Sequence, residues 1–346
     1  RELMQHLYTV ERNKSIRHGF LFSVYFALFL FICFNLYETT SMYNTNAAVQ
    51  KLMLDTPFRD ATYRKNFYEV MTHGEFWQWL EEPFLDAVLP RDLYAGRPLQ
   101  EGEIGSTLRY LQIVGPIRLR QSRMSNNSCA ERRFTDLVST LTGPNGETLG
   151  RFDNKAGVCY SEFELKSEDT APFGPNGRYT WSDGHHTMNG LIGFGSSYGS
   201  GGFVTDVPAN RTEADALIAQ MKADRWTDLS TRAVAINVNM YNTQTRLVTV
   251  VRILFEFYNS GHLTRSVKVF SNPLKVYQRK MDFFRLSCEV LYIILWFHYC
   301  HVEIKEWWHY RPRRAYLKSF RNLFELLVLF INFIFMGEWG LYLMSP

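Results

Sequence analysis

The sequence predicts a membrane protein in which a large α+β domain is inserted between transmembrane helices. Three apolar runs indicate the helices: Phe20 to Tyr37, Phe283 to Val302 and Leu323 to Met344. Each run approaches the roughly 20 residues that a helix needs to cross a hydrocarbon core of about 30 Å. The mean hydropathy of −0.21 averages these runs with a long polar segment, so it does not argue against a membrane protein.

The basic residues predict the orientation of these spans, because short cytosolic flanks are rich in Lys and Arg. Three basic residues lie within the ten positions before the first run, and six lie between the second and third: Arg12, Lys14 and Arg17, then Lys305, Arg311, Arg313, Arg314, Lys318 and Arg321. Both flanks are therefore assigned to the cytosol. The predicted organisation is cytosolic 1–18, first span 19–38, outside domain 39–281, second span 282–303, cytosolic link 304–321 and third span 322–346.

Two other interpretations of these features are weaker. A cleaved signal peptide would need a small-residue site after the first run, and Glu38 to Met42 is a poor one. The basic clusters adjoin the spans and form no separate basic domain, so nucleic acid is not an expected partner.

The cysteines divide along the same topology. Cys33, Cys288 and Cys300 fall in the predicted spans, which leaves Cys129 and Cys159 in the outside domain. A pair in an oxidising compartment is expected to form a disulfide, and a loop of about 30 residues closed in this way contributes about 3 kcal/mol. Two free buried thiols are the alternative.

N-x-[ST] sequons begin at Asn126 and Asn210 and predict N-glycosylation of the outside domain. Asn13 also begins a sequon, but it lies on the cytosolic side, where we expect no glycan.

Periodicity predicts helices and a hairpin in the outside domain. A helical spacing of apolar residues runs over 73–89 with a break at Pro83, and a second helix over 212–226 is expected to be capped by Thr212. Alternation over 234–240 and the apolar run 246–258 predict two strands, which would pair across the turn at 242–245.

No catalytic or cofactor motif emerges. The glycine-rich segment 193–202 lacks a Walker lysine, and His185 and His186 lack further ligands at a familiar spacing. Neither a nucleophile elbow nor an HExxH motif is present. We expect no enzyme activity, no cofactor and no metal site.

Several stretches occur in an order that resembles the polycystin subfamily of TRP cation channels, over almost the whole chain. They are RELMQHL, NFYEVMTHGEFWQWLEEPFLDAVL, GPIRLRQSRMSNNSC, SEDTAPFGPNGRYTW, GSSYGSGGFVTDV, DRWTDLSTRAVAINVNMYN, VVRILFEF, PLKVY, MDFFRLSCEVLY and YLKSFRNLFELLVLF. The resemblance implies that the spans are S1, S2 and S3 of a voltage-sensor-like bundle and that the outside segment is the polycystin (TOP) domain.

The resemblance also implies a function. It predicts a subunit of a homo- or heterotetramer of polycystin-family chains that passes cations without strong selectivity, with calcium as a permeant ion rather than a cofactor. A ciliary or plasma membrane is expected, with the endoplasmic reticulum as the alternative. The outside domain is expected to drive assembly and gating, and an extracellular glycoprotein is a further partner to consider.

Particular residues acquire roles from the same resemblance. Cys129 and Cys159 lie where the family's disulfide is expected, in a projection that contacts a neighbouring subunit. Four residues in the family's motif stretches are expected to hold the outside domain together: Arg118, Arg120, Trp226 and Arg232.

Glu289 and Glu325 are the predicted intramembrane charges. A carboxylate within a span is costly unless it faces the helix bundle and meets a cation. By analogy with voltage sensors, both are expected to receive Lys or Arg from an S4 helix. The alternative is static pairing, such as Arg285 with Glu289 at i,i+4.

The family's S4, S5, S6 and selectivity filter have no counterpart in these residues, so no pore is assigned. We expect the sequence to be a piece of a longer channel; a three-span protein that joins full-length subunits is the alternative. Two other function classes are a membrane anchor or accessory subunit whose glycosylated outside domain binds extracellular partners, and an enzyme of the outer membrane face.

Overall fold

A computed structural model describes most of the chain: residues 2–35, 39–59, 63–93, 96–98, 100, 103–108, 110–126, 128, 160–184, 189–277, 280–309 and 313–344. The chain divides into two compact units, and each is considered by itself. Unit 1 comprises residues 1–39 and 275–346, and unit 2 comprises residues 40–274.

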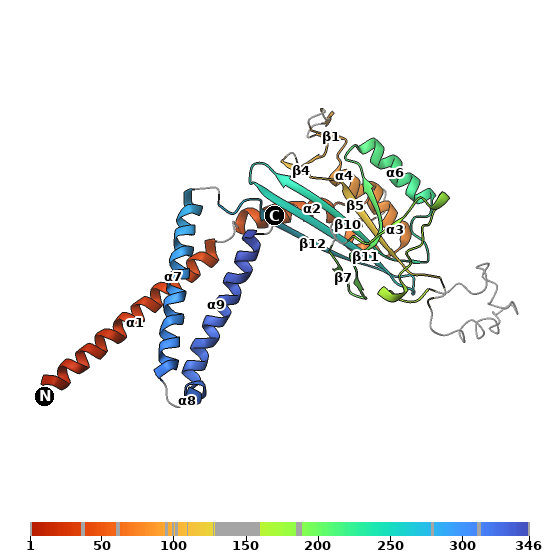
Figure 1. Cartoon of the computed structure of the whole chain (residues 1–346). Helices are drawn as coiled ribbons and strands as arrows, with labels where there is room; N and C mark the ends of the chain where they lie inside the picture. Colours follow the sequence, from red (N-terminus) through yellow and green to blue (C-terminus); the bar gives the residue numbers. More distant parts are fainter. Residues whose placement is uncertain are drawn as a thin grey trace. The chain divides into compact units, whose positions relative to one another are not determined.

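Unit 1 is helical (Figure 1). Its helices are α1 (Glu2–Asn35), α7 (Lys280–His309), α8 (Arg313–Lys318) and α9 (Phe320–Met344). In α7 and α9, the segments Lys280–His309 and Asn322–Leu343 are long and apolar enough to cross a membrane, whereas the apolar part of α1, Gly19–Phe34, is shorter. The helix predicted to reach Tyr37 ends at Asn35; residues 36–38 lie outside the described residues.

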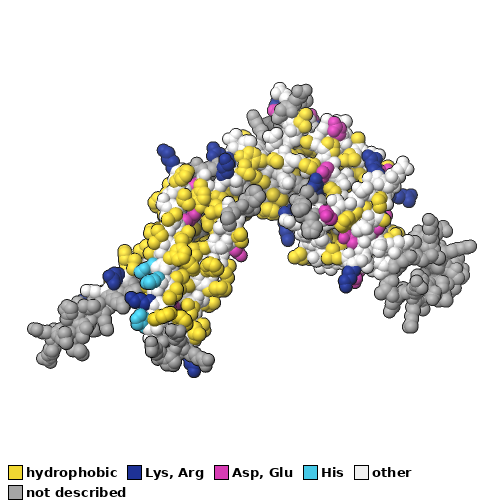
Figure 2. Space-filling view, in the orientation of Figure 1, with side chains coloured by type: hydrophobic (Ala, Val, Ile, Leu, Met, Phe, Trp, Pro, Cys, Tyr) yellow, Lys and Arg dark blue, Asp and Glu magenta, His cyan; other side chains and the backbone are white. Residues whose placement is uncertain are grey.

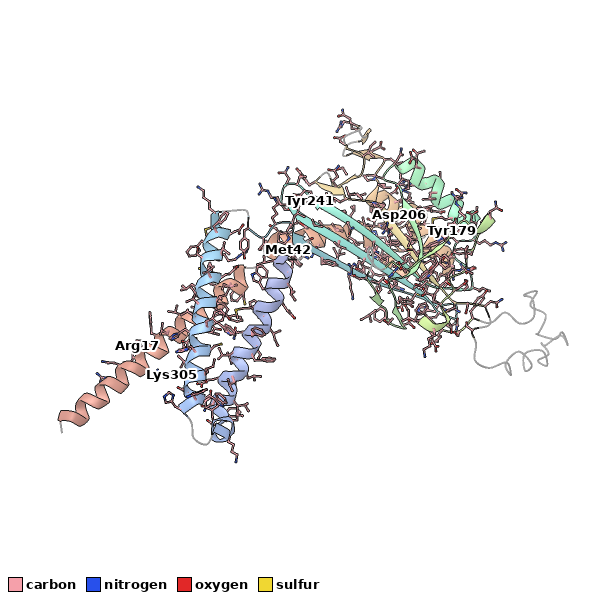
Figure 3. The ribbon with its side chains drawn as sticks, viewed as in Figure 1. Arg17, Met42, Tyr179, Asp206, Tyr241 and Lys305 are labelled. Carbon is pink, nitrogen blue, oxygen red and sulfur yellow. The ribbon has the colours of Figure 1, made fainter. Side chains whose placement is uncertain are left out.

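The outer surfaces of α7 and α9 are apolar, as Figure 2 shows over this unit. Large side chains more than half exposed are Phe283, Phe284, Ile294 and Phe297 on α7 and Phe320, Phe330, Ile331 and Leu341 on α9. Figure 3 shows Arg17 on α1 and Lys305 on α7 toward the same end of unit 1. This end carries the basic flanks that the sequence assigns to the cytosol.

Unit 2 combines short helices with a large antiparallel sheet. Its helical segments are α2 (Thr39–Leu54), η1 (Phe67–Glu69), α3 (His73–Trp79), the π-helical η2 (Leu80–Phe84), α4 (Leu85–Val88), η5 (Leu165–Ser167), η6 (Pro175–Gly177) and α6 (Arg211–Ala223). Its strands are β1 (Asp92–Leu93), β2 (Arg97–Pro98), β3 (Ser106–Thr107), β4 (Leu111–Ile113), β5 (Ile117–Arg123), β6 (Trp181–Ser182), β7 (Leu191–Ile192), β8 (Ser197–Tyr198), β9 (Gly202–Val207), β10 (Thr231–Asn242), β11 (Leu247–Phe257) and β12 (Leu263–Pro273).

The main sheet has the order β12-β11-β10-β5-β9-β6, and β4 pairs with both β10 and β3. The predicted hairpin is confirmed: β10 and β11 pair antiparallel from Ala233↔Glu256 to Asn242↔Leu247. Because side chains alternate across a strand, the two long strands present one continuous apolar face. That face carries Val234, Ile236, Val238, Val251, Ile253 and Phe255, all buried.

Helices cover this apolar face. Val49 and Met53 from α2, Trp79 from α3 and Ile218 from α6 belong to the same buried cluster as the sheet residues. A second, smaller cluster on the other side of the strands joins Ala235 to Tyr198 and other residues. The sheet is therefore covered mainly on one side.

The helix predicted over 73–89 is present, and its interruption follows from proline chemistry. Pro83 has no backbone N–H to donate, and the helix widens into the π-helical turn Leu80–Phe84 around it. The predicted cap of the second helix is wrong by two positions: Asn210, not Thr212, is the N-cap of α6, and its side chain accepts a hydrogen bond from the Thr212 N–H at 3.0 Å.

His73 makes the stability of unit 2 depend on pH. It opens α3, where a positive charge is unfavourable, and its ring lies 4.5 Å from that of Phe257. Burial lowers the pKa of His73 below its usual 6.5. Below pH 6.5 the unfolded chain therefore takes up a proton before the folded chain does, so stability falls with acidification by at most about 1.4 kcal/mol per pH unit.

We expect the thermal midpoint of the chain to fall between pH 7.5 and pH 5.5, and His73→Gln to remove part of that fall. The measurement is thermal unfolding of both proteins across this pH range. The exposed His262 supplies a matched variant, His262→Gln, which should keep the full pH dependence. An equal fall in the wild type and the His73 variant would contradict the assignment.

Candidate functional site in the membrane helices

One face of α7 carries a stripe of polar and aromatic side chains. Arg285, Glu289, Tyr292, Trp296 and Glu303 recur at intervals of three, four or seven residues, which places them along one side of a helix with 3.6 residues per turn. Arg285, Glu289 and Tyr292 are buried although most of their neighbours on α7 are exposed. The stripe is thus the face that α7 turns toward the rest of unit 1.

At the first end of the stripe, Glu289 is paired. Its carboxylate lies 3.1 Å from the Arg285 guanidinium and accepts a hydrogen bond from the Tyr277 hydroxyl. Arg285 also donates to the carbonyl of Val276 at 2.9 Å and lies 5.2 Å from the centre of the Tyr277 ring. The static pairing considered as an alternative is therefore present in this structure.

The middle of the stripe joins three helices through polar groups. The rings of Tyr25 on α1 and Tyr292 on α7 stack with centroids 4.8 Å apart, and their hydroxyls lie 3.2 Å apart. Tyr292 donates onward to the amide oxygen of Asn332 on α9, whose own NH₂ donates to Val328 at 2.7 Å. A buried polar chain of this kind fixes the facing sides of the helices.

The other end of the stripe holds carboxyl groups. Glu303 on α7 accepts a hydrogen bond from Tyr316 on α8, and Glu325 on α9 lies close enough to interact electrostatically with Glu303. Beside them is a cavity of about 440 Å³ whose lining includes Glu303, Tyr316 and the apolar side chains of Trp296 and Leu329. Glu303 is the carboxyl in the lining of this cavity, so a cation entering the cavity would meet that group first.

In the outside unit, the four residues predicted to hold the domain together all make internal contacts. Arg118 forms a two-bond pair with Asp206, at 2.7 and 2.8 Å, and Arg120 donates to the carbonyls of Gly199 and Ser200 at 2.7 Å each. Burial lowers the pKa of Arg120, which is 2% exposed.

The other two residues are equally enclosed. Trp226 is fully buried, and its carbonyl accepts from Gln121 at 2.6 Å. Arg232 donates to backbone carbonyls between 2.8 and 3.2 Å away, on Ser161, Leu229, Thr231 and Tyr160. Contacts of this kind join segments of the domain to one another.

Cys129 and Cys159 lie outside the described residues, as do His185 and His186. Both sequon asparagines, Asn126 and Asn210, are exposed, and the Ser128 hydroxyl of the first sequon accepts from the Ser161 N–H at 2.9 Å. Cys33, Cys288 and Cys300 are free thiols. Within the described part of the chain, no cluster of three or more His, Cys, Asp or Glu could hold a metal ion.

Sequence reasoning missed Glu303, because the predicted apolar run ended at Val302. The spacing contained a usable signal: Glu303 lies fourteen residues, about four turns, beyond Glu289. The same face of the helix therefore carries both carboxylates.

These features define a class of protein: a subunit in which long apolar helices are joined to a large sheet-rich domain. Residues 66–275 match the family model of the polycystin domain, and residues 276–341 match that of the polycystin cation channel. The chain belongs to the polycystin family.

Sequence identity to individual members of the family is modest. The chain is 27% identical to Polycystin-2-like protein 2 of Mus musculus over 94% of its own length and 49% of the relative's. It is 27% identical to Polycystin-2-like protein 1 of Homo sapiens, over 91% of its own length and 37% of the relative's. It is 29% identical to Polycystin-2 of Danio rerio, over 89% of its own length and 32% of the relative's. The chain thus spans half or less of the length of these relatives.

Proposed function

We propose that the chain supplies the S1 to S3 helices and the outside domain of a tetrameric, calcium-permeable, non-selective cation channel subunit. The observation that carries this proposal is the polar stripe of α7, which ends at Glu303 in the lining of a cavity, with Glu325 of α9 close to Glu303. Two carboxylates close together repel each other, so a cation between them is favoured. A basic side chain from a fourth helix would complete a voltage-sensor-like bundle there.

In this proposal Glu325 contributes to gating, and Glu289 is a structural partner of Arg285. The cavity holds the cation in one state of the channel and releases it in the other. Neutralising Glu325 weakens that hold, so the state with the occupied cavity loses population.

The test is Glu325→Gln in the full-length channel, studied by patch-clamp recording. We expect the ratio of open to closed channels at a fixed voltage to change at least about five-fold, which corresponds to a coupling of about 1 kcal/mol. Glu338, exposed on the same helix, supplies the matched control Glu338→Gln, which should leave gating unchanged. Normal assembly with unaltered gating of the Glu325 variant would count against the proposal.

The outside domain is proposed to drive assembly. Ile192 and Phe194 support this role, because each is 77% exposed on the β7–β8 hairpin. The backbone N–H groups of Phe194 and Gly195 are held by the buried carboxylate of Glu256. Rigid, exposed apolar side chains are typical anchors of protein interfaces.

Three further assignments belong to the same proposal. They are a disulfide between Cys129 and Cys159, N-glycans on Asn126 and Asn210, and residence in a ciliary or plasma membrane. The compartment supports the first two, since an oxidising, lumenal environment favours both modifications.

A further inference from the structure

Three segments far apart in the sequence meet at one end of unit 2. Leu111 of β4 pairs with Asn242, the last residue of β10, so Leu108 and Tyr110 lie beyond the end of that strand. The β10–β11 turn, 243–246, is its neighbour. At the edge of the sheet Leu247 pairs with Pro273, and the Leu274 N–H donates to the Arg246 carbonyl at 3.2 Å.

The start of α2 belongs to the same end. Ser271, near the end of β12, donates to the side chain of Asn46 on α2 at 2.7 Å. Figure 3 shows Met42 and Tyr241 toward the same end of unit 2, with Tyr179 farther along. We call Leu108, Tyr110, the turn 243–246, Leu274 and Tyr43 together the rim.

The rim exposes side chains that favour a membrane surface. Tyr43 is 72% exposed, Leu274 60%, Tyr110 55% and Leu108 41%, and Arg246 is exposed among them. Aromatic residues are enriched where water meets lipid, and an Arg can place its apolar stem along lipid while its charge stays among the headgroups.

Two rim residues hold a backbone conformation that their side chains disfavour. Leu108 has φ of +50° and Arg246 has φ of +58°. Glycine or asparagine fits this left-handed region better. A strained leucine at the tip of an exposed turn indicates that its side chain has a use outside the fold.

The chain itself keeps the rim close to the bilayer. Leu274 is six residues before Lys280, the first residue of α7, and six extended residues span at most about 20 Å. On the other side, α2 begins at Thr39, four residues after α1 ends at Asn35. Unit 2 is therefore tied to the membrane helices by two short connections, and both reach it at the end that carries the rim.

We propose that the rim rests on the headgroup layer of the outer leaflet, with its tyrosines and leucines among the phospholipids and Arg246 beside their phosphates. This inference depends on α1 and α7 crossing the membrane, and it is independent of conduction or gating. The lipid contact would limit rocking of the outside domain on its two connections.

The test is photocrosslinking of the full-length channel in nanodiscs of phosphatidylcholine that carries an alkyne tag on its headgroup. A benzophenone amino acid replaces Tyr43 or Tyr110 in the rim, or Phe194 as the control. Phe194 is more exposed, and its contact Glu256 lies at the other end of β11. We expect at least five-fold more tagged lipid at the rim positions. Equal yields, or crosslinks mainly to a second polypeptide, would overturn the proposal.

Relief of the strain gives a second readout. Leu108→Asn places a better-suited residue at positive φ, and we expect it to raise the thermal midpoint by about 2–4 °C while lowering the lipid crosslink at Tyr110 at least two-fold. Gln244→Asn, at an exposed position without positive φ, is the control. A lower midpoint for the Leu108 variant, or an unchanged crosslink, would show that Leu108 serves the fold instead of the lipid.

Discussion

Replacing Glu256 by alanine is expected to lower the stability of the outside domain by about 3 kcal/mol and its thermal midpoint by about 6–12 °C. Glu256 is 2% exposed, and its carboxylate accepts from the N–H groups of Phe194 and Gly195 at 2.7 and 3.1 Å. It also accepts from the Tyr198 hydroxyl at 3.0 Å. The substitution would leave these three donors without their acceptor, together with the Thr264 hydroxyl that donates more weakly at 3.4 Å, and an unsatisfied buried donor costs about 1–3 kcal/mol.

The surroundings of Glu256 leave little room for compensation. A Cβ added to Gly193 would clash with the Glu256 carboxylate, so the hairpin backbone lies directly against it. Burial, together with the charge of Glu256, raises the pKa of Tyr198 and keeps its hydroxyl protonated as a donor. Another side chain is poorly placed to take over the role of the carboxylate.

Thermal unfolding and limited proteolysis of the full chain measure this effect. Glu256→Gln preserves the shape but has one acceptor oxygen, so about half of the loss is expected. The double variant Ile192→Ser with Phe194→Ser changes the exposed tip alone and should stay within about 0.5 kcal/mol of the wild type, while weakening assembly if the tip is a subunit contact. A Glu256→Ala protein with an unchanged thermal midpoint and an uncleaved β7–β8 hairpin would show that Glu256 does not hold the hairpin in place.

Local sequence patterns predicted those parts of the fold that local forces decide. The alternation over 234–240 and the short turn after it led to the β10–β11 hairpin, and Pro83 led to the interrupted helix. The cap of α6 was misassigned because Asn210 and Thr212 are both good capping residues, and the choice between them depends on where the helix joins β9. The pairing of β5 with both β9 and β10 joins segments more than eighty residues apart, which no local pattern reveals.

The candidate site was predicted to a similar extent. A charge within an apolar run is conspicuous, so Glu289 and Glu325 could be found from the sequence alone. The partner of each could not: Glu289 is near Arg285 along its own helix, whereas Glu325 meets Glu303 only through the packing of α7 on α9. Glu256 escaped notice because a single acid in a strand is ordinary, and the loop that it holds comes from residues 193–195.

The second large effect is expected at the Arg285–Glu289 pair. Both side chains are less than a tenth exposed, and they pair at 3.1 Å. Removal of one partner from a buried pair leaves an uncompensated charge, which costs about 3–5 kcal/mol. Arg285→Leu should therefore lower the temperature at which the full-length channel loses its intact peak in size-exclusion chromatography. Arg285→Lys keeps the charge but loses the planar fork, so we expect a smaller decrease.

The double variant Arg285→Leu with Glu289→Leu separates structure from gating. Replacing a whole buried pair by apolar residues is often neutral or stabilising, so the intact peak should return to nearly its wild-type temperature. If the pair is only structural, the rescued channel should open as the wild type does, because no charge that moves during gating has lost its partner. The only other change is that the Tyr277 hydroxyl loses Glu289 as a hydrogen-bond acceptor. If the rescued protein assembles but its voltage dependence is altered, Glu289 exchanges partners during gating, and the pairing seen here is one of its two states.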